Sequence, residues 1–381
     1  MAAPSATRRN DAGAASAARR NDARAVLAAA IDAHTEADPN QRTEREDLNP
    51  RATVCVDELT GDPQAFALSV ARGLSNEPRQ LDCRYLYDEI GSGLFAEITE
   101  QPEYYPTRAE AEILADHADA LASELGSVTI CELGSGTSEK TRLLLEAWSQ
   151  RSEGDFHYVP VDIDPVVLLG AAADLAERHA NLRVSGLATS YENALVRLRD
   201  VTPKALLFLG STIGNFEPAE MDKFLRQVEA ALRPGDAFLL GIDLVKDVSV
   251  LEAAYNDAAG VTERFTLNLF DRMNRELDAG IPEKAVEHVA FWNEQSDQIE
   301  IYGRFRRDVQ IVLPDLEQCF EVAEGEMVRV EVSRKFRVEQ MAERLARYRL
   351  RLDRVLTDRG RRFAVLLLRR TETADEASPP A

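Results

Sequence analysis

The residues best placed to do chemistry are an acid and two glycines, Glu132, Gly134 and Gly136, which follow the β-branched, apolar run 128–131. Glycines at a turn between a strand and a helix let the backbone approach a nucleotide closely. Further along, a second short apolar run ends in Asp162, and a carboxylate there can accept both hydroxyls of a ribose. The spacing predicts an α/β domain that holds an adenosine-containing cofactor.

The same loop discriminates among cofactors. A P-loop needs glycine directly before its lysine, and an NAD fingerprint needs a third glycine at the same place. Glu139 occupies that place, next to Lys140. We expect Glu139 and Glu132 to repel a pyrophosphate, whereas S-adenosylmethionine carries a cationic sulfonium and amine and no phosphate. The loop therefore favours S-adenosylmethionine, and a strand, turn and helix without ligand is the alternative.

Composition limits the partners and the compartment. A chain of 381 residues suggests two domains, or one large domain with an insertion. Its formal net charge of -21 argues against nucleic acid and anionic membrane surfaces, because both attract cationic side chains. No apolar run reaches the roughly 18 residues that a membrane span needs, and the N-terminus lacks the apolar segment of a secretory signal. We expect a cytoplasmic protein.

No metal site is expected. The four cysteines lie far apart in the sequence without CxxC spacing, which is typical of reduced, intracellular thiols. The five histidines form no HxH or HxxxH pair. These patterns give no indication of a zinc site.

The elements that must position the glycine loop alternate between strand and helix. Their apolar strands look buried on both faces, which indicates a parallel sheet covered by helices. Thr107 is predicted to cap a helix through Glu124, with Glu110 completing a capping box. Strands are predicted at 128–133, 157–162, 182–185, 205–209 and 237–243, and helices from the loop to about 150, at 166–178 and at 218–232.

The periodicity changes after residue 246. A long helical region precedes segments that alternate between polar and apolar residues, which is typical of antiparallel strands. A last apolar strand then returns to the sheet. The predicted elements are a helical region at 250–278, strands at 287–293, 298–312 and 327–333, a helix at 337–347 and the returning strand at 362–369.

This change predicts a Rossmann-like domain, 110–245 plus 336–370, that is interrupted by an insertion. The insertion, 246–335, is expected to pair with 51–109 as an α+β substrate-binding domain, with the substrate between the two domains. Residues 1–50 contain few large apolar side chains and are expected to form a disordered extension. Residues 371–381 are expected to be a loose tail.

Several further segments occur in a characteristic order: YDEIGS at 87–92, PEYYPTR at 102–108, the Gly134 loop, FLGSTIGN at 208–215, GIDLVKD at 241–247, YNDAAGVT at 255–262 and NREL at 274–277. In this order they resemble the S-adenosylmethionine-dependent histidine Nα-methyltransferases of ergothioneine biosynthesis. The resemblance covers about 75 to 370. It implies a Rossmann-like class I methyltransferase sheet and S-adenosylmethionine as cofactor.

The resemblance implies a set of cofactor-binding residues: Tyr87, Gly134, Gly136, Lys140, Asp162, Ser190 and Tyr191. Lys140 is implied to reach the methionine carboxylate, which is electrostatically reasonable; its alternative is a solvated lysine in the first turn of a helix. Tyr87 is implied to lie near the amino-acid end of the cofactor. The adenine segment departs from the family, because Ser190 and Tyr191 stand where Asp and Phe are usual. The aromatic ring is kept and the carboxylate is lost.

Asn215 follows the strand 205–209 at the carboxyl edge of the sheet, where ligands bind in open α/β folds. Its amide can donate to a carboxylate while its carbonyl accepts from an amine, so it can hold both backbone groups of an amino acid. The resemblance agrees and adds Tyr255 as a carboxylate donor. The alternative for Asn215 is a turn residue after glycine.

Tyr104, Glu331 and Ser333 are implied by the resemblance to recognise an imidazole. Glu331 and Ser333 lie two apart on a predicted strand and therefore face the same side. A carboxylate beside a hydroxyl can accept an imidazole N–H; the alternative is the exposed polar face of an edge strand. Ile301 stands where the family has a methionine that lines the pocket.

The implied reaction is trimethylation of the α-amine of L-histidine to hercynine. Tyr87 and Asn215 are the candidates for holding the neutral amine in line with the methyl group. Two other functions stay open: the same fold acting on another amino acid, such as a tryptophan derivative, and a non-catalytic binding or scaffold protein. A monomer with a small-molecule substrate, and without nucleic-acid or membrane partners, is expected.

Overall fold

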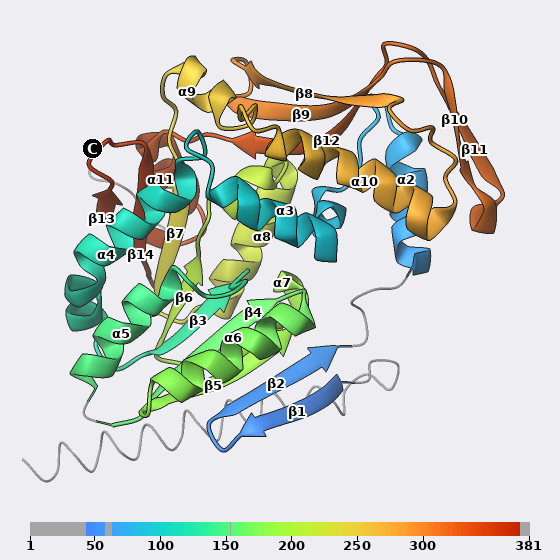
Figure 1. The fold of residues 1–381 in the computed structure, drawn as a ribbon. Helices are drawn as coiled ribbons and strands as arrows, with labels where there is room; N and C mark the ends of the chain where they lie inside the picture. The colour runs from blue at the N-terminus through green and yellow to red at the C-terminus, as the bar shows by residue number, and fades with distance from the viewer. Residues whose placement is uncertain (1–42, 58–62, 153, 374–381) are drawn as a thin grey trace, which may run out of the picture.

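The computed structural model describes residues 43–57, 63–152 and 154–373 (Figure 1). Their largest element is a nine-stranded mixed sheet in the order β1-β2-β5-β4-β3-β6-β7-β14-β13. The strands from β2 to β7 in that order pair in parallel, and β1, β14 and β13 are antiparallel to their neighbours. The strands are β1 (Thr43–Asn49), β2 (Ala52–Asp57), β3 (Thr129–Leu133), β4 (Phe156–Asp162), β5 (Leu182–Ala188), β6 (Lys204–Phe208), β7 (Ala237–Asp243), β13 (Leu350–Thr357) and β14 (Phe363–Arg370).

Helices cover both faces of this sheet, which is why its central strands are apolar on both sides. Successive strand residues point to opposite faces, so Leu207 and Leu206 of β6 belong to two different hydrophobic cores. The first core contains residues of α4 (Pro106–Leu125), α5 (Thr141–Arg151) and α6 (Pro165–Arg178). The second contains residues of α7 (Tyr191–Arg197), α8 (Pro218–Ala231) and α11 (Val338–Ala346).

A second group of elements lies over the ends of the strands at which the glycine loop sits (Figure 1). It contains a three-stranded antiparallel sheet in the order β12-β9-β8 and a separate two-stranded sheet, β10-β11. Its elements are α2 (Pro63–Leu74), α3 (Glu89–Thr99), α9 (Val248–Ala253), α10 (Val261–Leu277), β8 (Val286–Asn293), β9 (Gln298–Phe305), β10 (Val309–Leu313), β11 (Gln318–Val322) and β12 (Met327–Arg334).

Two predicted elements are each divided in the structure. The helical region 250–278 forms α9 and α10. The second helix begins after Gly260, and the carboxylate of Asp257 accepts from its first two amides, those of Val261 and Thr262 (both 2.7 Å). The predicted strand 298–312 forms β9 and β10, which belong to different sheets. The sequence did not predict β11, or β13 at the edge of the large sheet.

The start of the described chain also differs from the prediction. Residues 43–49 form β1 where the sequence predicts a disordered extension, and β2 pairs in parallel with β5 in the large sheet although residues from 51 onward were expected in the substrate-binding domain. β2 is short, and its apolar side chains are buried because β1, β5 and α6 lie beside it. The rest of the predicted extension, 1–42, and the tail from 374 lie outside the described residues.

The helix that Thr107 is predicted to cap is α4, but its N-cap lies two residues earlier, at Tyr105, and Pro106 is in its first turn. No capping box forms, because the side chain of Glu110 points away from the helix start. Glu110 is 0% exposed and accepts from the amide of Gly210 (2.7 Å). The helix therefore begins with a proline, whose missing N–H costs nothing at that position, and Glu110 is left for a tertiary contact.

Candidate functional site

The glycine loop lies at the carboxyl end of β3, the central strand between β4 and β6. Gly134 and Gly136 have positive φ angles of 71° and 49°, which L side chains adopt only with strain. A Cβ atom at Gly134 would lie 2.7 Å from the hydroxyl of Tyr191. The amides of Gly134 and Ser135 donate to the carbonyl of Val161 on β4 (2.8 and 3.0 Å). Conformation and space together therefore require glycine at 134.

Asp162, at the end of β4, holds the same loop. Its carboxylate accepts from the amides of Gly136 (2.8 Å) and Asp164 (3.1 Å). Burial raises the pKa of Asp162, and these backbone hydrogen bonds oppose the increase. In the same loop, the hydroxyl of Ser135 is buried and has no hydrogen-bond partner in the part of the chain that the structure describes. The loop thus presents a carboxylate and an unsatisfied hydroxyl that a polar ligand can complete.

Glu132 does not face a ligand site, contrary to the prediction that its charge helps to select the cofactor. It is 3% exposed, and its carboxylate accepts from the hydroxyls of Thr141 (2.6 Å) and Tyr158. Burial raises the pKa of Glu132 to about 7, while these two hydrogen bonds lower it. Glu132 therefore ties the start of α5 to β4. Glu139 is exposed.

Lys140 connects the glycine loop to the loop after β6. Its ammonium forms an ion pair with Glu110, whose carboxylate also accepts from the amide of Gly210. The side chain of Lys140 is 28% exposed and that of Glu110 is 0% exposed. The structure therefore does not support the alternative for Lys140, a solvated lysine in the first turn of a helix. One buried carboxylate holds two loops at the carboxyl edge of the sheet.

Ser190 and Tyr191 lie at the start of α7. The hydroxyl of Ser190 accepts from the amide of Asn193 (3.3 Å) and so caps the helix. The ring of Tyr191 packs edge-on against Phe208 and Phe224, with centroid distances of 5.4 and 6.4 Å. Its hydroxyl reaches the glycine loop, so Tyr191 forms part of the loop's support.

Asn215 ends the short 3-10 helix η3 (Thr212–Asn215), which follows β6. Its amide donates to the carboxylate of Glu331 on β12 (3.1 Å). A Cβ atom at Gly214 would lie 2.7 Å from the carbonyl of Arg334, so η3 packs directly on β12. The close backbone contact at Gly214 therefore brings together two predicted acceptor residues that are more than a hundred positions apart.

Tyr255 and Ser333 form a second pair beside Glu331. Their hydroxyls lie 2.7 Å apart, and both accept a hydrogen bond from the ammonium of Lys335 (2.8 Å each). Lys335 is also paired with Asp243, at the end of β7 (2.9 Å). Burial raises the pKa of Glu331 to about 7, against the influence of the Lys335 charge and the Asn215 hydrogen bond.

Aromatic rings pack beside these groups. Tyr87 and Tyr104 both pack edge-on against Phe95 (5.5 and 6.2 Å), and Tyr104 also packs edge-on against Tyr255 (6.2 Å). Burial raises the pKa of Tyr87 and of Tyr104 well above the usual range, and Glu331 adds to both increases. Ile301 is 2% exposed and lies opposite Glu331 in the β9–β12 pairing.

The structure thus gathers the predicted acceptor residues into one region that combines a carboxylate, hydroxyls, an amide and aromatic rings. It also adds three groups that the sequence did not predict at the site: Lys335, Asp243 and Glu110. Asp243 could have been found from its place at the carboxyl end of a predicted parallel strand. Lys335 is two positions beyond Ser333, in the spacing that continues one face of a strand. Nothing in the sequence indicated the contact of Glu110 with Gly210, because the local pattern predicts a helix-capping role for Glu110.

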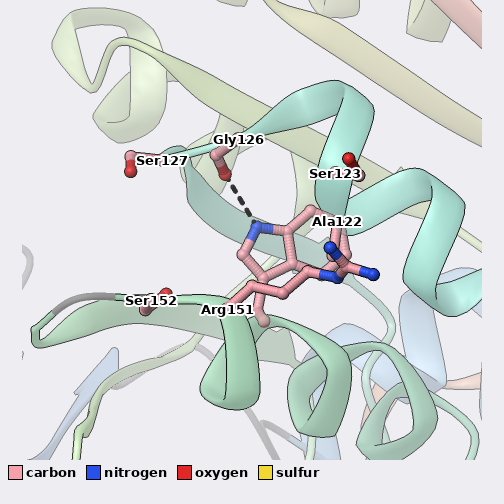
Figure 2. Close-up of a pocket in the computed structure, with 7 residues that line it drawn as sticks. Ala122, Ser123, Gly126, Ser127, Arg151 and Ser152 are labelled. Atoms are coloured by element: carbon pink, nitrogen blue, oxygen red, sulfur yellow. Dashed lines mark hydrogen bonds between the residues drawn. The ribbon is translucent and has the colours of Figure 1, made fainter.

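A small cavity of about 200 Å³ lies elsewhere, lined by the C-terminal ends of α4 and α5 (Figure 2). Within it, the indole N–H of Trp148 donates to the carbonyl of Gly126 (3.0 Å). Gly126 precedes β3, whereas the glycine loop follows it, so the cavity lies at the amino end of this strand and the glycine loop at its carboxyl end. It is separate from the predicted site.

Residues 66–370 match the family model described as histidine-specific, S-adenosylmethionine-dependent methyltransferase. The histidine N-alpha-methyltransferase of Mycolicibacterium smegmatis is 42% identical over 81% of this chain and 97% of its own length. Ergothioneine biosynthesis protein 1 of Schizosaccharomyces pombe is 29% identical over 61% of this chain and 32% of its own length. The 4-dimethylallyltryptophan N-methyltransferase of Claviceps purpurea is 27% identical over 70% and 84%, respectively.

The sheet, its glycine loop and these similarities define a Rossmann-like, S-adenosylmethionine-dependent methyltransferase. More narrowly, the chain belongs to the histidine-specific family of these enzymes. The predictions of fold, cofactor and family are confirmed. Among the described residues, no helix has both the length and the apolar character that crossing a membrane requires.

Proposed function

We propose that this enzyme methylates the α-amine of L-histidine three times, giving hercynine for ergothioneine biosynthesis. The observation that carries the proposal is the convergence of Asn215, Glu331, Tyr255 and Ser333 beside the loops at the carboxyl edge of the sheet. Together these side chains offer partners for each polar group of histidine: the imidazole, the carboxylate and the amine. Membership of the histidine-specific family supports the same substrate.

In this proposal the cofactor lies against the glycine loop. Gly134 and Gly136 allow the backbone to approach it, and Asp162 accepts from the ribose hydroxyls. Lys140 holds the methionine carboxylate, and Tyr191 and Ser190 border the adenine. The buried, unpartnered hydroxyl of Ser135 fits a polar ligand at this place. When bound, S-adenosylmethionine supplies an electrophilic methyl group on its sulfonium sulfur.

The acceptor side recognises the amino acid. Glu331 and Ser333 accept from the imidazole N–H, and Ile301 and Tyr104 close the pocket around the ring. Asn215 and Tyr255 donate to the carboxylate. The anion of Glu331 accepts more strongly than the protonated acid does, so we expect the affinity for histidine to increase as the pH rises through about 7, where Glu331 ionises.

Each methylation forms an N–C bond and breaks the S–C bond, and a proton leaves the amine before the next round. Only a neutral amine is nucleophilic, so the protein must orient its lone pair towards the methyl group. Burial keeps Tyr87 a neutral phenol, since its pKa is raised well above the usual range. Tyr87 therefore accepts a hydrogen bond from the amine at neutral pH and does not act as an anionic base. Asn215 fixes the opposite side of the amine through its carbonyl oxygen.

The test is incubation with methyl-labelled cofactor and each of the twenty amino acids, with products identified by mass spectrometry. We expect histidine to be the preferred acceptor and the product to gain three methyl groups. Preference for tryptophan, or absence of product from histidine, would contradict the proposal.

A second candidate substrate is a tryptophan derivative, which is what the name of the Claviceps purpurea relative indicates for that enzyme. The buried carboxylate of Glu331 opposes it, because an indole leaves a larger apolar surface against the acid. A non-catalytic scaffold is the candidate from another class. Calorimetry with S-adenosylhomocysteine distinguishes the scaffold from the enzyme, since absence of binding would favour the scaffold.

The proposal extends to the organisation of the protein. The elements from 246 to 335, together with those from 63 to 109, form the substrate-binding part, and the large sheet forms the cofactor-binding part. We expect a cytoplasmic monomer. Sedimentation of the purified full chain measures the oligomeric state directly, and a stable dimer would contradict this part of the proposal.

A further inference from the structure

Lys335 is a buried cation directly behind the acceptor site. Its side chain is 1% exposed, and its ammonium reaches Tyr255, Ser333 and Asp243 at 2.8, 2.8 and 2.9 Å. An ammonium has three protons, so each contact uses one of them. The geometry leaves none for the substrate, and Lys335 can act on the substrate only through the groups that it contacts.

The hydrogen bonds of Lys335 constrain the two hydroxyls. Since the ammonium only donates, the oxygens of Tyr255 and Ser333 both accept from it. The two hydroxyls share one hydrogen bond between them, at 2.7 Å. Tyr255 and Ser333 each have one hydroxyl proton, and only one of the two protons is used in the bond between them. The other proton must point away from the pair. When Ser333 donates to Tyr255, that free proton belongs to the phenol and can be donated to a substrate carboxylate, while Ser333 keeps a lone pair for an imidazole N–H.

Lys335 also bears on Glu331, because its ammonium contacts Ser333 (2.8 Å) and Glu331 lies two positions before Ser333 on the same face of β12. Burial disfavours the anion of Glu331, and the charge of Lys335 is the first of two influences that oppose burial. The other titratable groups around these residues are Cys83, Tyr87, Tyr104, Tyr255, Asp243 and Lys246. Burial raises the pKa of the thiol and of the three phenols, which are neutral at pH 7, so the charges at pH 7 are those of Lys335, Asp243 and Lys246. Burial lowers the pKa of Lys246 to about 8, so its charge changes within the pH range of the test below.

A purely structural ion pair would be the simpler role for Lys335, but Lys335 is not the only partner of Asp243. Asp243 also accepts from the hydroxyl of Tyr105 (2.7 Å) and forms an ion pair with Lys246. Burying a second cation beside an already paired carboxylate is costly, and an apolar side chain of similar size often serves stability as well. The position of Lys335 is explained better by what it does to Tyr255, Ser333 and Glu331.

We propose that Lys335 is a positioning residue for the amino-acid substrate: it aims the free hydroxyl proton of the Tyr255–Ser333 pair and favours the anion of Glu331. This inference rests on the proposed function, because it assumes that these three residues contact histidine. It assigns Lys335 two separable effects, one through hydrogen bonds and one through charge.

Three substitutions separate the effects. Lys335→Met removes both donors and charge, Lys335→Gln keeps an amide donor without charge, and Lys335→Arg keeps the charge. The measurement is kcat and KM for L-histidine from about pH 6 to about pH 9, the range in which Glu331 and the substrate imidazole titrate. Ionisation of the substrate is common to all variants and cancels in their ratio. Binding of S-adenosylhomocysteine by calorimetry reports whether each variant is folded.

We expect Lys335→Met to lose roughly 10-fold to 100-fold in kcat/KM at pH 7, mainly through KM, as loss of a charge-assisted hydrogen bond implies. The acid limb of its profile of kcat/KM against pH should move to higher pH by about one unit, which is the lower end of the pKa shift that a nearby opposite charge causes. Lys335→Gln should move the limb with a smaller loss, and Lys335→Arg should leave the limb in place. In a Glu331→Gln background, Lys335→Met should no longer move it.

Met and Gln variants that bind S-adenosylhomocysteine normally and keep the wild-type pH profile would overturn the inference, as would an equal loss at every pH. If Lys335→Met fails to fold, Asp243→Asn/Lys335→Met removes both charges and carries the same test. Wild-type enzyme that makes no product from histidine overturns the proposed function instead, so the two failures are distinguishable.

Discussion

Glu331→Gln is expected to make the unliganded protein more stable while weakening its affinity for histidine. Burial raises the pKa of Glu331 from its usual 4.5 to about 7, so the folded state holds this proton more tightly than the unfolded state does. Ionisation of Glu331 therefore destabilises the fold as the pH rises from 4.5, and the full cost is present above about 7. Glutamine keeps the oxygen that accepts from Asn215 and never ionises.

The size of the effect follows from the two pKa values. At about 1.4 kcal/mol for each pKa unit, the change from 4.5 to about 7 corresponds to about 3 kcal/mol. Glutamine should therefore raise the free energy of unfolding by up to about 3 kcal/mol at pH 8 and change it little near pH 4. Other groups titrate identically in the two proteins and cancel in the difference.

The assay is urea unfolding of the full chain without ligands at about pH 5 and about pH 8, for wild type and variant. The matched control is Glu343→Gln, at an exposed position on α11, and it should leave the stability unchanged at both pH values. Calorimetry with histidine and S-adenosylhomocysteine then checks the second half of the prediction. A Glu331→Gln protein that is no more stable than wild type at pH 8 would refute the reasoning about burial.

Three further predictions concern the loops and the pocket. Gly134→Ala should weaken S-adenosylhomocysteine binding at least about 10-fold in calorimetry, because its Cβ meets Tyr191 at 2.7 Å, whereas Gly136→Ala meets nothing within 4 Å. Glu110→Gln should lower the free energy of unfolding by about 1–3 kcal/mol in urea, since it leaves Lys140 unpaired beside a buried site; unchanged stability would contradict the bridging role. Ile301→Met should retain the fold, with unfolding free energy within about 1.5 kcal/mol of wild type, and change KM for histidine more than kcat; equal changes in both would argue against a pocket-lining role.

The large sheet was predictable because its central strands carry their own signal. Buried parallel strands read as short, continuous apolar runs, and each is separated from the next by a helix of its own. The two edges of the sheet carry no such signal. β1 and β13 are the edge strands, and each pairs with one neighbour across a turn. β2 joins the sheet through β5, which lies far away in the sequence. Pairing across the chain, and not local propensity, makes them strands.

Most of the proposed acceptor residues could be suggested only through resemblance to a family. Asn215 follows a strand and can be placed at the sheet edge from its position alone. Nothing local in the sequence says that Glu331, on a strand of a different sheet, accepts from its amide. Likewise, the local pattern predicts that Glu132 faces a ligand and that Glu110 caps a helix. In the structure both carboxylates are buried and accept tertiary hydrogen bonds.

What the sequence by itself determined is the cofactor half of this enzyme: glycines at a strand-to-helix turn and an acid after the next strand, because both requirements are local to a few residues of backbone. What only the tertiary structure decided is the electrostatic state of the acceptor half. Whether Glu331 is charged depends on burial by several elements and on the ammonium of Lys335. Such a balance is a property of packed neighbours, which no window of sequence contains.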